Sequence, residues 1–154
     1  MVKNVFKKLG KKQKNNKGFS LVELIVVIAI MAVLVGVLAP QLIKYVEKSR
    51  EATDIQTCDN IATALKTYYA DEEVAASATA TTTVTVILGK TELGTVADTA
   101  VKDAGLTKAK IKGTKWTGDK ITIVYNKADG TITYTGDSPY YHSDKDQFKK
   151  GPKS

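Results

Sequence analysis

The stretch KGFSLVELIVVIAIMAVLVGVLAP, residues 17–40, decides the architecture of this chain. It contains one acidic residue, Glu23, which is followed by sixteen uncharged and almost wholly apolar residues, 24–39. As a helix, residues 19–39 would be about 31 Å long, enough to cross a bilayer core of about 30 Å. The stretch therefore predicts a membrane-spanning helix with a carboxylate near its N-terminal boundary.

A basic leader precedes this helix. Residues 1–18 contain seven lysines and no acid, which accounts for the whole formal net charge of +7. In the rest of the chain, basic and acidic residues balance. A lysine-rich segment directly before an apolar span stays on the cytoplasmic side of the membrane. The charge therefore indicates membrane orientation rather than a nucleic-acid-binding domain.

Three interpretations of the apolar stretch compete. It could be a plain membrane anchor, or a secretory signal peptide that is cut after Ala39, since residues 37–39 have the small side chains such a cut needs. Pro40 directly after that bond argues against the cut, because its ring is fixed and its N–H is missing. The third interpretation gives Glu23 a role. A carboxylate at the membrane boundary is costly unless it is paired, so a positive partner is expected.

The sequence GFSLVEL, residues 18–24, after a short basic leader resembles the class III signal sequence of type IV prepilins and related pseudopilins. The resemblance covers residues 17 to about 40. It rests on a glycine before an aromatic residue, a glutamate five residues into the mature chain, a long apolar run and then a proline. Beyond residue 60 the resemblance is one of architecture and not of motif.

The resemblance implies that residues 1–18 are a cleaved leader. A membrane-bound prepilin peptidase would cut between Gly18 and Phe19 on the cytoplasmic side and would then methylate the new amine of Phe19. A bulky residue at position 18 would hinder the approach of the peptidase to the backbone. A pilus assembly platform protein and an assembly ATPase are further partners that the resemblance implies, together with other pilin subunits and the membrane before assembly.

Cleavage would give Glu23 its positive partner. The new amine of Phe19 is a cation, and in a fibre the carboxylate can neutralise the amine of a neighbouring subunit. A lone charge in an apolar environment is penalised, and a pair much less so. We interpret Glu23 as a residue that sets the register of assembly and not as a catalytic residue.

Gly36 and Pro40 are expected to weaken the helix. Pro40 lacks its N–H and clashes with the carbonyl of residue 36, and glycine lowers the cost of leaving helical geometry. A simple kink is one interpretation. The sharper hypothesis is a helix break, in which the stretch between them unwinds when subunits pack in a fibre.

Residues 41–76 predict an amphipathic helix. Its apolar positions recur mostly every three or four residues: Leu42, Val46, Ala52, Ile55, Cys58, Ala62, Leu65 and Tyr69. Its charged positions are expected to form a solvated face: Lys44, Glu47, Lys48, Arg50, Glu51 and Asp54. Cys58 lies on the apolar stripe and is interpreted as a core residue.

Residues 77–154 predict a globular α+β head. Residues 77–83 are expected to be a linker, 84–88 a short strand or buried connector, and 95–104 a short helix that stops at Gly105. A three-stranded antiparallel meander is expected around Ile111 and Trp116, at residues 121–125 and at 131–135, with turns at 117–119 and 127–130. The polar residues 137–154 are expected to be a mobile or loosely docked tail.

The predicted fold class is therefore α+β, with a long N-terminal helix packed on a small antiparallel sheet. Side chains expected to face the C-terminal half of the helix are Ile121, Ile123, Tyr125, Ile132 and Tyr134. Cys58 is the only cysteine, so the disulfide that often closes the C-terminal region in the resembled family cannot form. This departure favours a Gram-positive type of pilin.

Enzymatic chemistry has no support in the sequence. His142 has no serine or cysteine nucleophile at a telling spacing, and no Cys/His cluster, phosphate loop or glycine-rich fingerprint occurs. We expect no enzyme, no cofactor and no metal. Late aspartates at residues 119, 129 and 137 are most simply turn formers.

Nucleic-acid contact is a further hypothesis. Lysines gather around an aromatic ring at Lys110, Lys112, Lys115 and Trp116, and basic residues with an exposed ring can hold DNA. The favoured alternative is a solvated sheet edge, where lysines discourage pairing between sheets.

The functional interpretation is a type IV pilin. It is made as a single-pass membrane precursor and polymerised into an extracellular surface filament for adhesion, motility or biofilm. The alternative is a pseudopilin of a type II secretion or DNA-uptake machine. A monomeric, membrane-anchored binding protein is the third class.

Overall fold

The computed structural model describes residues 18–70, 82–91, 93–94 and 99–153. The chain divides into two compact units, Met1–Pro40 and Gln41–Ser154. We call the second unit the head. The predicted α+β fold class, with a long N-terminal helix and a small antiparallel sheet, is confirmed.

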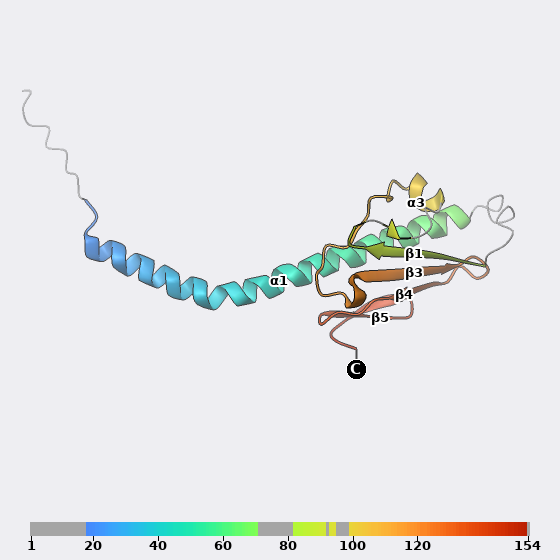
Figure 1. Cartoon of the computed structure of the whole chain (residues 1–154). Coiled ribbons are helices and arrows are strands. Elements are labelled where there is room, and N and C mark those ends of the chain that lie inside the picture. Colours follow the sequence, from blue (N-terminus) through green and yellow to red (C-terminus); the bar gives the residue numbers. More distant parts are fainter. Residues whose placement is uncertain (1–17, 71–81, 92, 95–98, 154) are drawn as a thin grey trace, which may run out of the picture. The chain divides into compact units, whose positions relative to one another are not determined.

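Helix α1 runs from Leu21 to Tyr69 and includes Pro40 (Figure 1). The Leu24 N–H donates to the Ser20 carbonyl at 3.1 Å, which closes the first turn, and the Ala70 N–H donates to the Lys66 carbonyl at 2.9 Å after the last. The sequence predicted helix as far as residue 76, and residues 71–76 lie outside the described ones.

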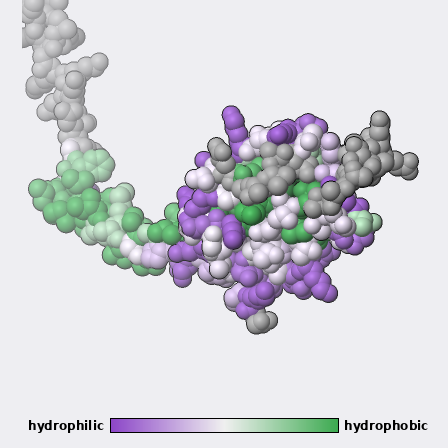
Figure 2. Space-filling model, turned by 45° about the vertical axis from the view of Figure 1, so that its right-hand side comes forward, coloured by the Kyte–Doolittle hydropathy of each residue, from purple (hydrophilic) through white to green (hydrophobic). Residues whose placement is uncertain are grey.

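The first unit contains the apolar turns of α1. Its large apolar side chains between Leu21 and Leu38 are all exposed, by fractions from 44% at Val27 to 73% at Leu21. In the described part of the chain, one helix, α1, is long and apolar enough to cross a membrane. Figure 2 shows these turns as an almost unbroken apolar surface.

The head contains a four-stranded antiparallel sheet in the order β2-β1-β3-β4. Its strands are β1 (Thr83–Gly89), β2 (Leu93–Gly94), β3 (Lys120–Asn126) and β4 (Ile132–Thr135). Strands β1, β3 and β4 alternate buried and less buried residues, as expected for a sheet with one face on the core. The register sets Ile123 opposite Val86 on one side and Tyr134 on the other.

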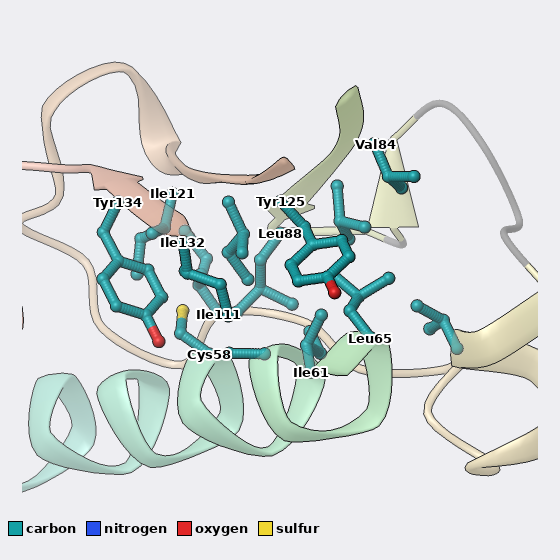
Figure 3. Packing of buried hydrophobic residues seen from close by; sticks show 14 of the residues in the cluster. Cys58, Ile61, Leu65, Val84, Leu88, Ile111, Ile121, Tyr125, Ile132 and Tyr134 are labelled. Carbon is teal, nitrogen blue, oxygen red and sulfur yellow. The ribbon is translucent and has the colours of Figure 1, made fainter. Parts of the chain in front are cut away.

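The core lies between this sheet and the C-terminal half of α1 (Figure 3). Helix α1 contributes Cys58, Ile61 and Leu65, all 0% exposed. The five strand side chains predicted to face the helix are all buried in this cluster, so that prediction is confirmed. Burial of Cys58 also confirms its interpretation as a core residue, and desolvation raises the pKa of its thiol above the usual range.

The predicted meander is wrong in its first strand. Strand β3 pairs with β1 and β4, and the segment around Ile111 and Trp116 forms no strand. The Ile111 N–H donates to the Gly89 carbonyl at 2.9 Å. This backbone hydrogen bond connects the segment to the end of β1. The short run at 84–88 is a strand, one of the two alternatives left open.

The predicted short helix is partly described. Helix α3 runs from Thr99 to Asp103, and residues 95–98 lie outside the described ones. Gly105 adopts φ of +70°, and the Leu106 N–H donates to the Val101 carbonyl at 3.0 Å. This left-handed glycine ends the helix, as the sequence indicated. Glycines 118 and 130 also have φ of +70° in the two predicted turns.

The C-terminal segment differs from the mobile tail that was predicted. It forms a two-stranded sheet of β5 (Tyr141–Asp144) and β6 (Gln147–Lys150). The Phe148 ring meets the rings of Trp116 and Tyr134 at centroid distances of 5.7 and 5.2 Å. His142 Nδ1 bonds the Gly151 carbonyl at 2.8 Å. Aromatic packing anchors this polar segment, which its composition did not reveal.

Candidate processing and assembly site

The predicted cleavage site is not covered by any part of the chain that the structure describes. Gly18 and Phe19 precede the first turn of α1 and belong to no helix or strand. The Phe19 side chain is 88% exposed, and no described atom beyond its chain neighbours comes within 4 Å of a Cβ placed on Gly18. An exposed and non-helical peptide bond is accessible to an enzyme that must reach the backbone.

Glu23 forms a helix cap in the subunit. Its Oε2 accepts a hydrogen bond from the Ser20 backbone N–H at 2.9 Å. This is the reach-back bond of a capping box, in which a glutamate at the third helical position satisfies the N–H before the helix. The sequence interpretation missed this role, although the spacing Ser20-x-x-Glu23 before an apolar run is its recognised signal.

The cap places the carboxylate beside the end that cleavage would create. The N–H that donates to Glu23 belongs to Ser20, the residue directly after Phe19. The N-terminal end of a helix also carries partial positive charge, which favours a carboxylate there.

Gly36 and Pro40 do not interrupt the helix in the subunit, where α1 is continuous through both. No described atom outside the helix backbone lies within 4 Å of a Cβ placed on Gly36. The hypothesis of a helix break concerns packed subunits, and it stays a prediction.

The head contains a buried cluster of acids that the sequence interpretation placed wrongly. Glu47, Glu51 and Asp54 were expected on a solvated face, but their exposed fractions are 7%, 0% and 0%. The apolar residues Leu42 and Val46 of the same helix are instead 63% and 43% exposed. Over these turns, α1 therefore presents carboxylates to the rest of the head.

Two of these acids are buried because they accept hydrogen bonds from backbone N–H groups of the loop at residues 112–114. The N–H groups of Lys112 and Gly113 donate to the two Asp54 carboxylate oxygens at 2.7 Å each, and the Trp116 Nε1–H donates to Asp54 Oδ2 at 2.9 Å. The Thr114 N–H donates to Glu47. Three consecutive N–H groups are thus paired by helix carboxylates, and the bond of the middle one, Gly113, is buried, where an N–H group must have a partner. We call residues 112–116 the acceptor-bound loop.

Glu51 ties the C-terminal segment to the same cluster. The Ser138 hydroxyl donates to Glu51 Oε2 at 2.5 Å, whereas the buried Glu51 Oε1 has no hydrogen-bond partner among the described residues. A like-charge pair at positions 47 and 51 is unfavourable on an exposed helix. That pair was the signal in the sequence that these acids have partners outside the helix.

Gly113→Ala is expected to destabilise the head by about 1–3 kcal/mol, because overpacking a filled site costs this much. A Cβ at this position would lie 2.7 Å from Glu51 Cγ and 2.9 Å from both Asp54 Oδ2 and Trp116 Nε1. Urea unfolding followed by circular dichroism would measure the loss. Gly36→Ala, which has free space around it, is the control; equal stability of Gly113→Ala and wild type would contradict the close packing.

Glu51 is expected to make the head less stable as the pH rises. Desolvation, followed by the neighbouring charges of Glu47 and Asp54, raises the pKa of Glu51 above 4.5, and the Ser138 bond opposes the rise only in part. The folded state therefore holds a proton that the unfolded state loses near pH 4.5. This contribution is complete below pH 4.5 and is lost as the pH rises through the higher folded pKa.

The measurement is the free energy of unfolding of wild type and Glu51→Gln at several pH values. Glutamine keeps an oxygen for the Ser138 hydroxyl but cannot ionise. The stability of the variant relative to wild type should increase from pH 4.5 upward. Parallel pH profiles would show that Glu51 does not titrate differently in the folded state.

The lysines of the nucleic-acid hypothesis are exposed, but the ring is not. Lys110, Lys112 and Lys115 are exposed, whereas Trp116 is 2% exposed and its Nε1–H is engaged by Asp54. The assumption of an exposed ring is therefore wrong, and this ring offers no face for base stacking. What remains is a group of surface lysines, which also fits the alternative of a solvated edge.

His/Cys/Asp/Glu groups that could hold a metal ion do not occur in the described part of the chain. The carboxylates of the buried cluster accept from N–H and O–H donors, which is an arrangement for anchoring a loop and not for binding a cation.

Comparison with known proteins adds one match. Residues 13–39 match the family model of the prokaryotic N-terminal methylation motif. The matched range includes Gly18, Phe19 and Glu23. No solved structure matches the chain significantly. The match supports a type IV pilin-like or pseudopilin-like protein with a membrane-anchored precursor: at its N-terminal end, this chain carries the prokaryotic N-terminal methylation motif, the class III signal sequence found in type IV prepilins.

Proposed function

We propose that this chain is a structural subunit of a type IV pilus. It is made as a membrane-inserted precursor, cleaved between Gly18 and Phe19, methylated on Phe19 and polymerised into a surface filament that serves adhesion, motility or biofilm formation. The observation that carries the proposal is the long exposed apolar surface of α1 with one carboxylate, Glu23, at its N-terminal edge.

The apolar surface of α1 must be shielded from water both in the precursor and in the filament. A soluble monomer rarely exposes so large an apolar patch, whereas a helix in a bilayer or inside a bundle of like helices buries it. The lipid-covered stage is the precursor and the helix-covered stage is the filament. The same residues therefore span the membrane in the precursor and pack against neighbouring helices in the filament. Loss of the lysine-rich leader between these two stages removes the positive charge that holds the N-terminal end on the cytoplasmic side.

In the filament, Glu23 would select one alignment of neighbouring helices. Apolar helices slide along one another without a preferred register, because their surfaces are alike. Pairing of Glu23 with the Phe19 amine of a neighbour neutralises both charges and fixes one axial position. The prepilin peptidase, the assembly platform protein and the assembly ATPase are the partners that this route requires.

The subunit is proposed to be of the Gram-positive type. Its lone cysteine is buried and free, so no disulfide closes the C-terminal segment. The contacts of Ser138 with Glu51 and of Phe148 with Trp116 hold that segment to the rest of the head instead.

The yield of sheared surface fibres tests the filament. Cells that express the protein are sheared, and the fibre fraction is probed with an antibody against the head. A pilin is expected to be abundant in this fraction. A scarce product would instead indicate a pseudopilin of a secretion or DNA-uptake machine, and complete absence would indicate a monomeric anchored protein.

A further inference from the structure

A hollow of about 400 Å³ lies on the head at the first turns after Pro40. Helix α1 contributes Gln41, Lys44, Tyr45 and Lys48, and the segment between β4 and β5 contributes Tyr140. The four helix positions are spaced by three, one and three residues, so they share one face of α1. The hollow thus has two ammonium groups, two phenol rings and one amide.

Neither lysine forms an ion pair with a residue that the structure describes. The acids three residues further on, Glu47 and Glu51, would normally compensate them on the helix surface. These acids are turned into the head, where they accept from the Thr114 N–H and the Ser138 hydroxyl. The buried cluster thereby leaves a positive site open at the surface.

The position of the site along the chain points to its ligand. Lys44 and Lys48 follow Ala39, the last residue of the apolar run, by five and nine residues. At about 1.5 Å per residue, they rise no more than about 8 and 14 Å beyond the hydrocarbon boundary. The polar headgroup layer extends about 5–8 Å beyond that boundary, and the long lysine side chains can reach back into it. Tyrosine rings also prefer this depth.

We infer that this hollow binds the phosphate of an anionic phospholipid while the chain is inserted in the membrane. Lys44 and Lys48 neutralise the phosphate, and Tyr45, whose side chain is 69% exposed, and Tyr140 supply hydroxyl donors and lie among the headgroups. The inference rests on the membrane-inserted stage of the proposed function and not on the filament. A bound lipid would hold the head at the membrane surface before assembly.

The test is lipid retention by the full chain in nanodiscs of phosphatidylcholine and phosphatidylglycerol, read by native mass spectrometry. Each lysine near an anionic surface favours binding about fivefold. Lys44→Gln/Lys48→Gln removes two such lysines and is therefore expected to lower the retained ratio of phosphatidylglycerol to phosphatidylcholine by about 25-fold. The lysines of the leader contribute equally in every variant, so the difference between variants isolates the hollow.

Lys102→Gln/Lys108→Gln is the control, since it removes the same charge from two other exposed positions of the head. Its retention ratio should stay within about twofold of wild type, less than the loss of one lysine contact. An equal ratio in wild type and Lys44→Gln/Lys48→Gln would overturn the inference. So would an equal fall in the control, which would show diffuse attraction, or displacement of the lipid by millimolar glycerol phosphate, which would identify a soluble anion as the ligand.

Two further results separate this inference from the proposed function. A chain that does not enter nanodiscs would refute the membrane stage and the lipid site together. Lipid retention without sheared fibres in cells would leave the lipid site standing and remove the filament.

Discussion

Asp54→Ala is expected to lower the free energy of unfolding of the head by at least about 3 kcal/mol, because it leaves three donors without an acceptor at a cost of about 1–3 kcal/mol each. Two of them, the Gly113 N–H and the Trp116 Nε1–H, make buried hydrogen bonds with Asp54, and the bond of the Lys112 N–H is partly buried. Such a loss exceeds the effect of an ordinary surface substitution several times.

Urea unfolding of the full chain in detergent micelles would measure this change, with circular dichroism as the signal. Asp146→Ala is the matched control, because Asp146 is exposed. It should leave the unfolding midpoint almost unchanged. If Asp54→Ala and Asp146→Ala behaved alike, the buried carboxylate would not hold the acceptor-bound loop.

Glu23→Ala is expected to abolish filaments while the leader is still removed. The substitution leaves the Phe19 amine of each neighbour unpaired in an apolar environment, which costs about 3–5 kcal/mol. Since about 1.4 kcal/mol is a factor of ten, subunit association should weaken at least about 100-fold. Sheared fibre yield and the mass of the cell-bound subunit would measure assembly and cleavage separately.

The helix cap makes a sharper comparison possible. Glu23→Gln keeps an oxygen that can accept from the Ser20 N–H but has no charge. If the charge drives assembly, both variants fail to form fibres. If Glu23 acts only as a cap for α1, Glu23→Gln assembles normally and Glu23→Ala alone is impaired. That second pattern would remove the register role of the carboxylate.

The long helix was predictable because one signal was strong and local. An apolar run of this length with a basic leader has few structural solutions. Strands β3 and β4 were also predictable, since β-branched alternation and the turn at Gly130 agree with each other. The stop of α3 at Gly105 followed from the same kind of local rule.

The buried cluster was not predictable from helical periodicity alone. Periodicity assigns acids to solvent and apolar residues to the core, and at Glu51 and Leu42 the structure does the reverse. The cause is non-local, because the groups that donate hydrogen bonds to Asp54 lie 58 to 62 residues away along the chain. For the same reason, the sequence did not reveal that Phe148 packs on Trp116 and orders the C-terminal segment.

The most direct test of the central claim is the N-terminal sequence and mass of the mature protein, purified from the cell envelope and from sheared fibres. Cleavage between Gly18 and Phe19 makes Phe19 the first residue and removes seven lysines with the leader. We expect methylated Phe19 as the first residue in both fractions. An intact Met1, or a chain that begins at Pro40, would contradict the processing and with it the assembly role of Glu23.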